Sequence, residues 1–276
     1  MATPGRTRTP RGLTAPAIAM IIPASLRTIA CEHSNDRVGR PVMALPGTNG
    51  RHRVYLMRHG AVSYFDPAGA PVNPKYVELT AEGRVQAEAA RAALSEIPFD
   101  RAVCSGLPRT RQTAEIVLSG SALDIEDVPA LSEIRGGRFE DIPLERREAE
   151  LVYGFEAATR PGARFAGGEA FLDFEARVTE AFASQLMVTG WTHMLLVAHD
   201  AVNRMILGWV SGAGLAATPV FEQDMGCINI IDVDIVEGEV VRRLIKLLNV
   251  TPYNLTKLNL NLTSMEHVMA KFMESG

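Results

Sequence analysis

The sequence predicts an α/β protein, a three-layer α/β/α sandwich around a mainly parallel central sheet. Short apolar runs alternate with helical segments from residue 53 onward. This alternation is typical of parallel sheets whose strands are joined by helices. Hydrophobic residues make up 47% of the chain and charged residues 22%, as in an ordinary globular protein. The 276 residues are enough for one large α/β domain or two small ones.

The expected strands are short apolar runs that end at a polar residue or at a turn. The shorter ones cover residues 54–57, 101–104, 127–131 and 194–197. The third of these extended pieces is expected to end at Glu133. A longer run over 227–236 is rich in Ile and Val, which favours a strand. Glu237-Gly238 marks a turn to its hairpin partner over 240–248.

The expected helices begin at capping residues or after breaks in the pattern. Thr80 is the expected N-cap of the first helix. Gly167-Gly168 separates two helical stretches, and Thr263 opens a capping box with Glu266. The expected helical stretches cover residues 80–95, 108–118, 143–159, 169–189, 201–210 and 263–273.

The two ends of the chain differ from its central part. Three arginines precede an apolar run near the start, and no acidic residue occurs before Glu32. We therefore expect residues 1–50 to be a disordered extension, with a targeting segment as the alternative. Residues 51–250 form the expected catalytic domain, and residues 251–276 form a leucine-rich tail with a short helix. The tail leaves two docking modes open, on its own domain or on a second subunit of a homodimer.

Composition excludes several classes of function. The net charge of −4 at pH 7 lacks the basic excess of a nucleic-acid-binding surface. No stretch of about 20 apolar residues occurs, so no membrane span is expected. Cys31, Cys104 and Cys227 lie far apart, without the spacing of a metal site or of a disulfide framework. A reducing compartment, the cytoplasm, is therefore the expected location.

The most informative motif is Arg58-His59-Gly60, which follows the apolar run over 54–57. Open α/β sheets place their chemistry at the carboxyl ends of their strands. The planar guanidinium of an arginine can bind phosphate through two hydrogen bonds, and a histidine can act as a nucleophile. A glycine lets the backbone turn sharply close to a ligand. The motif therefore predicts a site for an anionic substrate.

Three further polar groups follow other predicted strands. They are Arg109 within the string 105–114, Glu133, and His199-Asp200. Because the carboxyl ends of parallel strands meet at one edge of a sheet, two arginines, two histidines and a carboxylate are expected to share a pocket. Arg111 lies two positions after Arg109, so it is expected to face elsewhere on its helix and to make a structural salt bridge.

The order of these motifs resembles that of the histidine phosphatase superfamily, branch 1, the phosphoglycerate mutase-like group. The resemblance spans about residues 54–248, nearly all of the expected folded part. It is carried, in chain order, by Leu56-Met57-Arg58-His59-Gly60, Leu79-Thr80 with Gly83 and Gln86-Ala87, Ser105 through Ala114, Leu131 through Glu140, Gly167-Gly168-Glu169, and Val197-Ala198-His199.

The resemblance implies a phosphatase that hydrolyses a small-molecule phosphomonoester through a phosphohistidine, with no metal ion and no cofactor. His59 would be the nucleophile, and Arg58, Arg109 and His199 would hold the phosphoryl oxygens. Glu133 would protonate the leaving oxygen and then activate water. For this role the pKa of Glu133 must be raised towards neutrality, and the cations of the pocket oppose such a rise.

Two departures from the family pattern bear on the site. Residues 61–62 and Phe65 stand where many members carry Glu, Thr and Asn, so Ser63 or a backbone amide is the candidate for one phosphate contact. Asp200 stands where glycine is usual. An aspartate at this position is the proton donor in the acid-phosphatase branch, so Asp200 could share the role of Glu133. We favour a simpler role for Asp200, the N-cap of the following helix.

Two other functions remain open on the same fold. A phosphoglycerate mutase would need a phosphohistidine that resists water, and the short stretch between residues 140 and 167 argues against it. A non-catalytic phosphate-binding protein would have no need of all five polar residues. Substrate specificity is expected to lie in residues 61–77 and 143–165, whose sequence does not indicate one substrate.

Overall fold

The computed structural model describes residues 50–66, 68–70, 72–138 and 141–274. All of them belong to one unit of the chain, Ala44–Gly276. The extension expected over residues 1–50 lies outside the described residues, apart from Gly50.

Six strands within these residues form one sheet, in the order β3-β2-β4-β1-β5-β6. The strands are β1 (Arg51–Arg58), β2 (Arg101–Cys104), β3 (Ile125–Asp127), β4 (His193–Ala198), β5 (Ile228–Val236) and β6 (Glu239–Val250). β3, β2, β4 and β1 run parallel. β5 pairs antiparallel with β1 and forms a hairpin with β6. The predicted mainly parallel sheet is confirmed.

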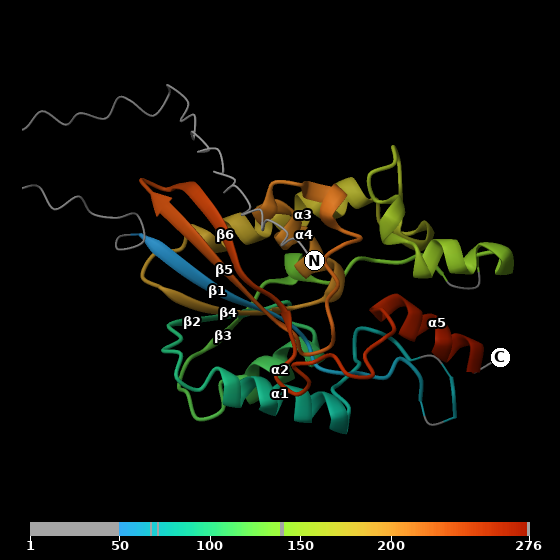
Figure 1. Cartoon of the computed structure of the whole chain (residues 1–276), viewed down its shortest axis with the longest axis horizontal. Coiled ribbons are helices and arrows are strands. Elements are labelled where there is room, and N and C mark those ends of the chain that lie inside the picture. The colour runs from blue at the N-terminus through green and yellow to red at the C-terminus, as the bar shows by residue number, and fades with distance from the viewer. Residues whose placement is uncertain (1–49, 67, 71, 139–140, 275–276) are drawn as a thin grey trace, which may run out of the picture. The chain divides into compact units, whose positions relative to one another are not determined.

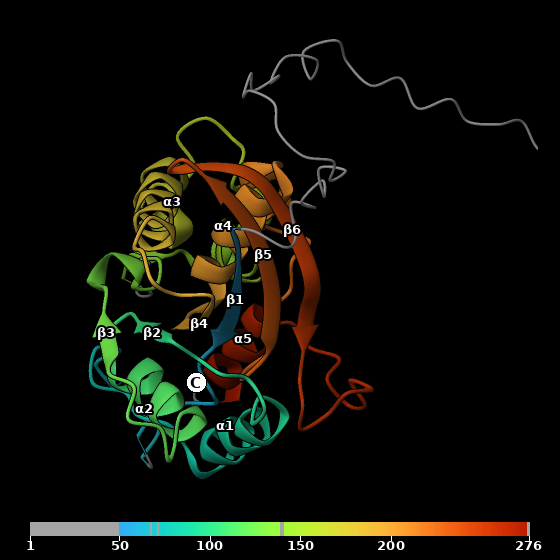
Figure 2. The same ribbon diagram turned by 90° about the vertical axis from the view of Figure 1, so that its left-hand side faces the viewer.

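Two pairs of helices cover the two faces of the sheet, which makes the predicted three layers (Figure 1). The helices are α1 (Ala81–Ala93) and α2 (Pro108–Val117) on one face, and α3 (Phe171–Leu186) and α4 (Asp200–Ser211) on the other. Figure 2 shows the sheet between these two layers. Val54 and Leu56 of β1 join the apolar cluster of α3 and α4, whereas Tyr55 and Met57 join that of α1 and α2. This alternation buries β1 on both faces, so its sequence is a continuous apolar run.

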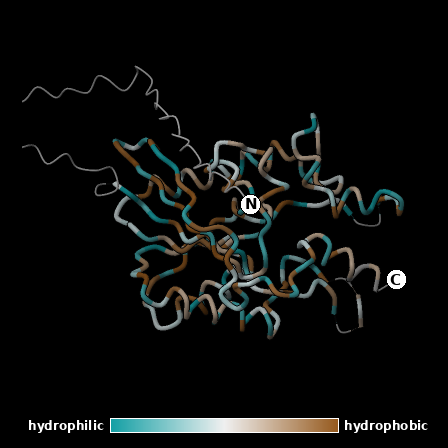
Figure 3. The backbone as a smooth tube through the Cα atoms, viewed as in Figure 1, coloured by the Kyte–Doolittle hydropathy of each residue, from teal (hydrophilic) through white to brown (hydrophobic). Residues whose placement is uncertain are grey.

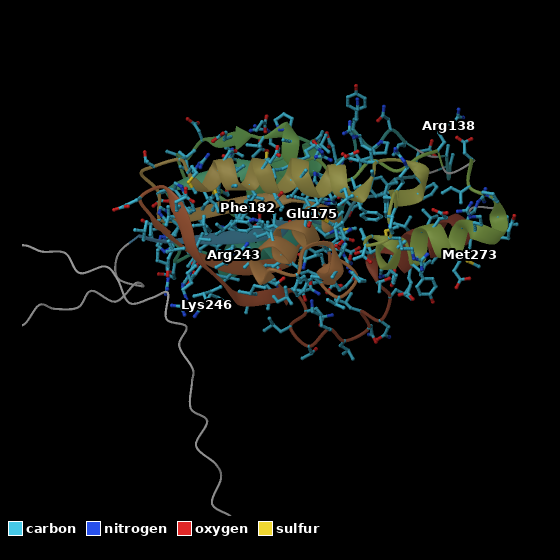
Figure 4. All side chains as sticks on the ribbon, turned by 90° about the horizontal axis from the view of Figure 1, so that it is seen from above. Arg138, Glu175, Phe182, Arg243, Lys246 and Met273 are labelled. Atoms are coloured by element: carbon cyan, nitrogen blue, oxygen red, sulfur yellow. The ribbon has the colours of Figure 1, made fainter. Side chains whose placement is uncertain are left out.

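Apolar residues gather in the central strands, as the hydropathy colouring of Figure 3 shows. The side-chain view of Figure 4 looks onto the face covered by α3, where Phe182 is labelled. The Phe182 ring packs edge-on against Trp209 of α4, with the ring centroids 5.7 Å apart. The guanidinium group of Arg243, on β6, lies over the Trp209 ring, 4.5 Å from its centroid. These contacts bind the helical layer to the antiparallel edge of the sheet.

The pairing of β1 with β4 determines where the two histidines of the motifs lie. The parallel register places Arg58 beside Ala198. The ladder continues one residue further, because the His59 N–H donates to the Ala198 carbonyl at 3.1 Å. His59 and His199 therefore leave two neighbouring strands at the same edge of the sheet.

The path from β3 to Glu133 differs from the prediction. β3 ends at Asp127, and a 3-10 turn over Pro129–Leu131 follows it. The pairing of β3 with β2 ends at Cys104, and Pro129 stands at the start of the turn, where its fixed φ suits a helical backbone. Glu133 thus follows a short helical turn and does not end a strand.

The stretch 143–159, expected to be rich in helix, contains only short turns. They cover Leu144–Arg146, Glu148–Val152 and Phe155–Ala157, and none of them is an α-helix. Gly154, a poor helix former, separates the last two turns. Among the helices that the structure describes, none is both long enough and apolar enough to span a bilayer.

The tail carries a helix, α5 (Ser264–Glu274), that packs on its own chain. The expected capping box forms, because the Thr263 N–H donates to Glu266 Oε2 at 2.7 Å and the Glu266 N–H donates to Thr263 Oγ1 at 3.2 Å. Met265 and Met269 pack against a small apolar cluster of Ile142, Leu151 and Ala166. α5 therefore lies beside the 141–170 segment, as Figures 1 and 4 show, the latter with Met273 labelled.

Two glycines allow α1 to pack closely on the backbone that follows His59. A Cβ at Gly60 would lie 2.4 Å from the Gly83 carbonyl oxygen, and a Cβ at Gly83 would lie 2.2 Å from the Ala61 carbonyl oxygen. Thr80, the N-cap of α1, also donates its backbone N–H to the Ala61 carbonyl at 3.0 Å. The start of α1 thus holds the chain where it leaves β1.

We expect Gly83→Ala to lower the free energy of unfolding by about 1–2 kcal/mol. Alanine gains about 1 kcal/mol of helix propensity over glycine. Overpacking costs about 1–3 kcal/mol, and the upper part of that range, about 2–3 kcal/mol, applies here because the obstacle is backbone that cannot rotate away. Urea unfolding measures the difference. Gly136→Ala is the control, because its new methyl group would meet no atom closer than Ala166 Cβ at 3.8 Å. A Gly83→Ala protein as stable as the wild type would contradict this close packing.

Candidate active site

The sequence motifs meet at the carboxyl edge of the parallel strands. Arg58 ends β1, Arg109 lies in the first turn of α2, and His199 precedes α4. These three side chains and that of His59 are buried. Glu133 reaches the same place, because its carboxylate contacts the first turn of α4. The structure therefore brings together all five residues that the motifs predicted.

His59 is held as a neutral imidazole. Its Nδ1 lies 2.8 Å from the Gly60 carbonyl oxygen, which can only accept a hydrogen bond. Nδ1 therefore carries the proton, and Nε2 keeps its lone pair. Burial lowers the pKa of His59 well below its usual range, and the nearby charges of Arg109 and Arg58 lower it further. Nε2 can thus act as a nucleophile at neutral pH.

His199 lies beside His59, with the ring centroids 5.3 Å apart and the rings inclined at 68°. Its Nε2 lies 2.8 Å from the hydroxyl of Ser105, which in turn lies 3.0 Å from the Thr110 hydroxyl. Burial lowers the pKa of His199 well below its usual range, and Arg109 and His59 act in the same direction. Two neutral histidines therefore stand side by side.

Arg58 is anchored through one nitrogen. Its Nη1 donates to the Gln223 carbonyl and to the Ser264 hydroxyl. The same nitrogen lies 3.8 Å from Asp200 Oδ2. The Gln223 side chain is fixed in turn, because Asn229 Nδ2 donates to its Oε1 at 2.7 Å.

Arg109 is anchored in the same manner from the other side of the site. Its Nη1 donates to the Pro74 carbonyl at 2.7 Å. Its own carbonyl accepts from the Thr113 hydroxyl at 2.7 Å, and that hydroxyl also accepts from the Gly60 N–H at 3.2 Å. Arg111 faces away and pairs with Asp127 at 2.6 Å, so its predicted structural salt bridge is confirmed.

Four buried polar atoms at this edge have no hydrogen-bond partner among the described residues. They are Arg58 Nε, Arg109 Nε, His199 Nδ1 and Asp200 Oδ2. An unpaired buried polar group costs about 1–3 kcal/mol, so such groups are rare outside functional sites. The two guanidinium N–H groups are permanent donors with positive charge. The arrangement can therefore bind an anion with several oxygens, such as a phosphoryl group.

Glu133 is poised to hold a proton. Its carboxylate accepts from the Ile134 N–H at 2.9 Å and from the Ala201 N–H at 3.3 Å. Burial raises the pKa of Glu133, and the charge of Asp200 raises it further. The two backbone N–H groups and Arg58 oppose this rise without cancelling it. The cations of the pocket thus lower the pKa of Glu133 less than we expected from the sequence.

The structure corrects the role that we favoured for Asp200. α4 begins at Asp200 itself, His199 is its N-cap, and no side chain makes a capping bond. The Asp200 carboxylate accepts from Arg204 Nε at 2.6 Å, and its second oxygen faces Arg58. Two buried guanidinium groups offer a carboxylate stronger, charge-assisted bonds than a helix start does, which explains why it does not cap.

Ser63, the other additional candidate, is engaged within its own loop. Its hydroxyl donates to the Phe65 carbonyl at 2.7 Å and accepts from the Phe65 N–H at 3.2 Å. With Phe65, Tyr76 and Glu78 it lines an open pocket of about 360 Å³ in the loop that follows β1. Ser63 thus lines a pocket of the loop, and its hydroxyl forms hydrogen bonds with the backbone of Phe65.

Sequence reasoning missed three groups that hold the site residues. Ser105 contacts His199, and Gln223 and Ser264 anchor Arg58. Ser105 is the first residue after β2, so the strand-end argument used for the histidines could have found it. Gln223 and Ser264 follow no strand of the parallel set and carry no local signal. No group of three His, Cys, Asp or Glu side chains that could hold a metal ion occurs in the described part of the chain.

Comparisons with known proteins agree with this geometry. The chain is 31% identical over 185 residues to the adenosylcobalamin/alpha-ribazole phosphatase of Salmonella typhimurium, and the match covers 66% of this chain and 90% of that protein. It is 33% identical over 170 residues to an Escherichia fergusonii protein named "Probable phosphoglycerate mutase GpmB", covering 58% of this chain and 75% of that one. The fold matches the crystal structure of the alpha-ribazole phosphatase from Shigella flexneri with a TM-score of 0.56 and 27% identity, over 71% of this chain and 96% of that one.

The match to a family model covers most of the described fold. It runs over residues 54–246, from β1 into β6, and includes all the motifs that contribute residues to the predicted pocket. The chain belongs to the histidine phosphatase superfamily, branch 1.

Proposed function

We propose that this protein is a phosphatase that hydrolyses a small-molecule phosphomonoester through a phosphohistidine, without a metal ion. The observation that carries the proposal is the state of His59. Its ring is buried with Nδ1 2.8 Å from the Gly60 carbonyl oxygen, which leaves Nε2 free, and its pKa is lowered by burial and by the nearby charges of Arg109 and Arg58. A nucleophile beside two permanent cations fits an anionic phosphoryl group.

In the first step, His59 Nε2 attacks phosphorus as the ester P–O bond breaks. The electron pair of that bond goes to the leaving oxygen, which takes a proton from Glu133. Arg58, Arg109 and His199 hold the other phosphoryl oxygens, because positioning and charge compensation are what phosphoryl transfer requires. The raised pKa of Glu133 supports its role as the acid.

In the second step, the Glu133 carboxylate accepts a proton from water while the water oxygen attacks phosphorus. The P–N bond breaks, inorganic phosphate leaves, and His59 and the Glu133 proton are restored. Asp200 is a weaker candidate for this proton, because Arg204 holds one of its oxygens at 2.6 Å. Asp200 contributes through its charge, which favours the protonated form of Glu133.

The substrate is a small phosphate ester, and the names of two relatives supply the first compounds to try. The Salmonella protein is named for adenosylcobalamin/alpha-ribazole phosphatase activity, so alpha-ribazole 5′-phosphate belongs in the first panel. A phosphoglycerate mutase is the second candidate, favoured by the name of the Escherichia fergusonii relative. Isomerisation of 3-phosphoglycerate in excess over phosphate release would favour the mutase.

The buried free thiols of Cys104 and Cys227 support a reducing, cytoplasmic location.

We expect His59→Ala to lower kcat/KM for phosphate esters by about 10⁴-fold or more, because it removes the nucleophile. The wild-type protein should show a burst of alcohol release and acid-labile label from a ³²P-labelled ester, and the variant should show neither. His193→Ala is the control, because His193 lies at the opposite end of β4. Full activity in His59→Ala would refute the phosphohistidine mechanism.

We expect kcat/KM to fall on the alkaline side as Glu133 loses its proton. Asp200→Asn removes a negative charge that favours protonated Glu133, so the pKa of Glu133 drops and the fall moves to lower pH. Glu133→Gln should abolish this limb together with most of the activity. The pKa of His59 lies well below its usual range, so protonation of His59 does not reduce kcat/KM near neutral pH.

The measurement is a pH profile of kcat/KM for both variants, with Glu180→Gln on α3 as the control. A shift of the Asp200→Asn limb to higher pH would contradict the proposed coupling.

A further inference from the structure

The tail helix α5 reaches the candidate active site through its first residue. Ser264 is buried, and its hydroxyl accepts a hydrogen bond from Arg58 Nη1. We propose that Ser264 is a positioning residue for Arg58, so that α5 completes the phosphate site although it lies outside the sheet. The proposal rests on the phosphate-holding role of Arg58 in the function proposed above.

The hydroxyl of Ser264 accepts a hydrogen bond from Arg58 and donates one to the Gln223 carbonyl, which Arg58 also contacts. Nη1 carries two protons, one of which goes to the Gln223 carbonyl and the other to Ser264. The Ser264 hydroxyl then donates its own proton to the same Gln223 carbonyl at 3.1 Å. Nη1 is thereby saturated, whereas Nε has no partner among the described residues. The Nη1 end of the guanidinium is the anchor, and the Nε edge remains for phosphate.

The backbone of Ser264 makes a second connection to the site. Its N–H donates to Glu222 Oε1 at 3.0 Å. The other oxygen of Glu222 accepts from Arg204, and Arg204 Nε donates to Asp200 at 2.6 Å. Asp200 faces Arg58, so these contacts close into a ring that begins and ends at the same guanidinium. Ser264 therefore fixes Arg58 directly and also supports the carboxylate that balances its charge.

The hydroxyl of Ser264 is not needed to start the helix. Thr263 provides the cap, because its hydroxyl accepts the Glu266 N–H in the capping box. Met265 and Met269 provide the packing of α5 on the 141–170 segment. With capping and packing supplied by other residues, the contacts of the Ser264 hydroxyl are all with Arg58 and Gln223. Removal of the Ser264 hydroxyl therefore leaves the cap and the packing of α5 in place, so a positioning role can be distinguished from a purely structural one.

The test measures the affinity of the full-length protein for inorganic phosphate by titration calorimetry, together with KM and kcat for p-nitrophenyl phosphate. We expect Ser264→Ala to weaken phosphate binding and to raise KM by about 10-fold, because a hydrogen bond to a charged group is lost. Ser264→Cys fills the same space with a poor hydrogen-bonding group, so it should behave like Ser264→Ala. Ser264→Thr keeps the hydroxyl and should stay within about twofold of the wild type.

Two controls separate this proposal from the proposed function. Ser184→Ala removes an exposed helix serine whose hydroxyl bonds within α3, and it should leave both readouts unchanged. Arg58→Lys should weaken phosphate binding at least as much as Ser264→Ala, because the fork geometry is lost. If Ser264→Ala and Ser264→Cys bind phosphate as the wild type does while His59→Ala still abolishes turnover, the positioning role is wrong and the phosphatase stands. If His59→Ala retains turnover, the phosphatase mechanism fails whatever Ser264 does. A wild-type protein that neither binds phosphate nor turns over p-nitrophenyl phosphate would overturn both.

Discussion

The site depends above all on the parallel pairing of β1 with β4. The bond from the His59 N–H to the Ala198 carbonyl holds the backbone of His59, the proposed nucleophile, against the strand that ends just before His199. Because side chains alternate between the two faces of a sheet, Arg58 lies on the same face as Leu56, the face covered by α3 and α4, where it lies near Asp200. The following residues turn towards Thr113 of α2. A slip of one residue in this register would turn each side chain to the opposite face of the sheet and would separate the two histidines.

The electrostatics of the site follow from what is buried beside the histidines. Burial lowers the pKa of both imidazoles well below the usual range, and the charges of two nearby guanidinium groups lower it further. Asp200 is the nearest counter-charge to Arg58, and it is shared with Arg204. The site therefore keeps a positive balance, which suits the phosphate dianion of the proposed substrate. The same Asp200 charge raises the pKa of Glu133, the proposed acid, so one carboxylate acts on both Arg58 and Glu133.

The predictable part of this protein is the part encoded by local pattern. The apolar runs that became β1, β2 and β4 place Arg58, His59, Arg109 and His199 by the rule that parallel strands share one edge. Glu133 reached the site by a path that the pattern did not predict, because a 3-10 turn beginning at Pro129 follows β3 where an extended run was expected. Ser264 could not be found from sequence, since it lies 206 residues from Arg58 and belongs to a different element. Asp200 was misread because a local cap and a distant ion pair compete for it, and only the fold decides between them.

The strand order also implies an order of assembly during folding. β1 is the first strand of the described chain, yet its two neighbours in the sheet are β4 and β5, which lie in the second half of the sequence. β2 and β3, by contrast, are neighbours in the sequence and in the sheet. Contacts between distant segments form slowly, because a long loop must close before any of them is made. A chain still emerging from a ribosome can therefore form β2 and β3 with their helices, but His59 meets no partner histidine until β4 has been synthesised. His59, the proposed nucleophile, is thus one of the first parts of the fold to be made and one of the last to acquire its surroundings.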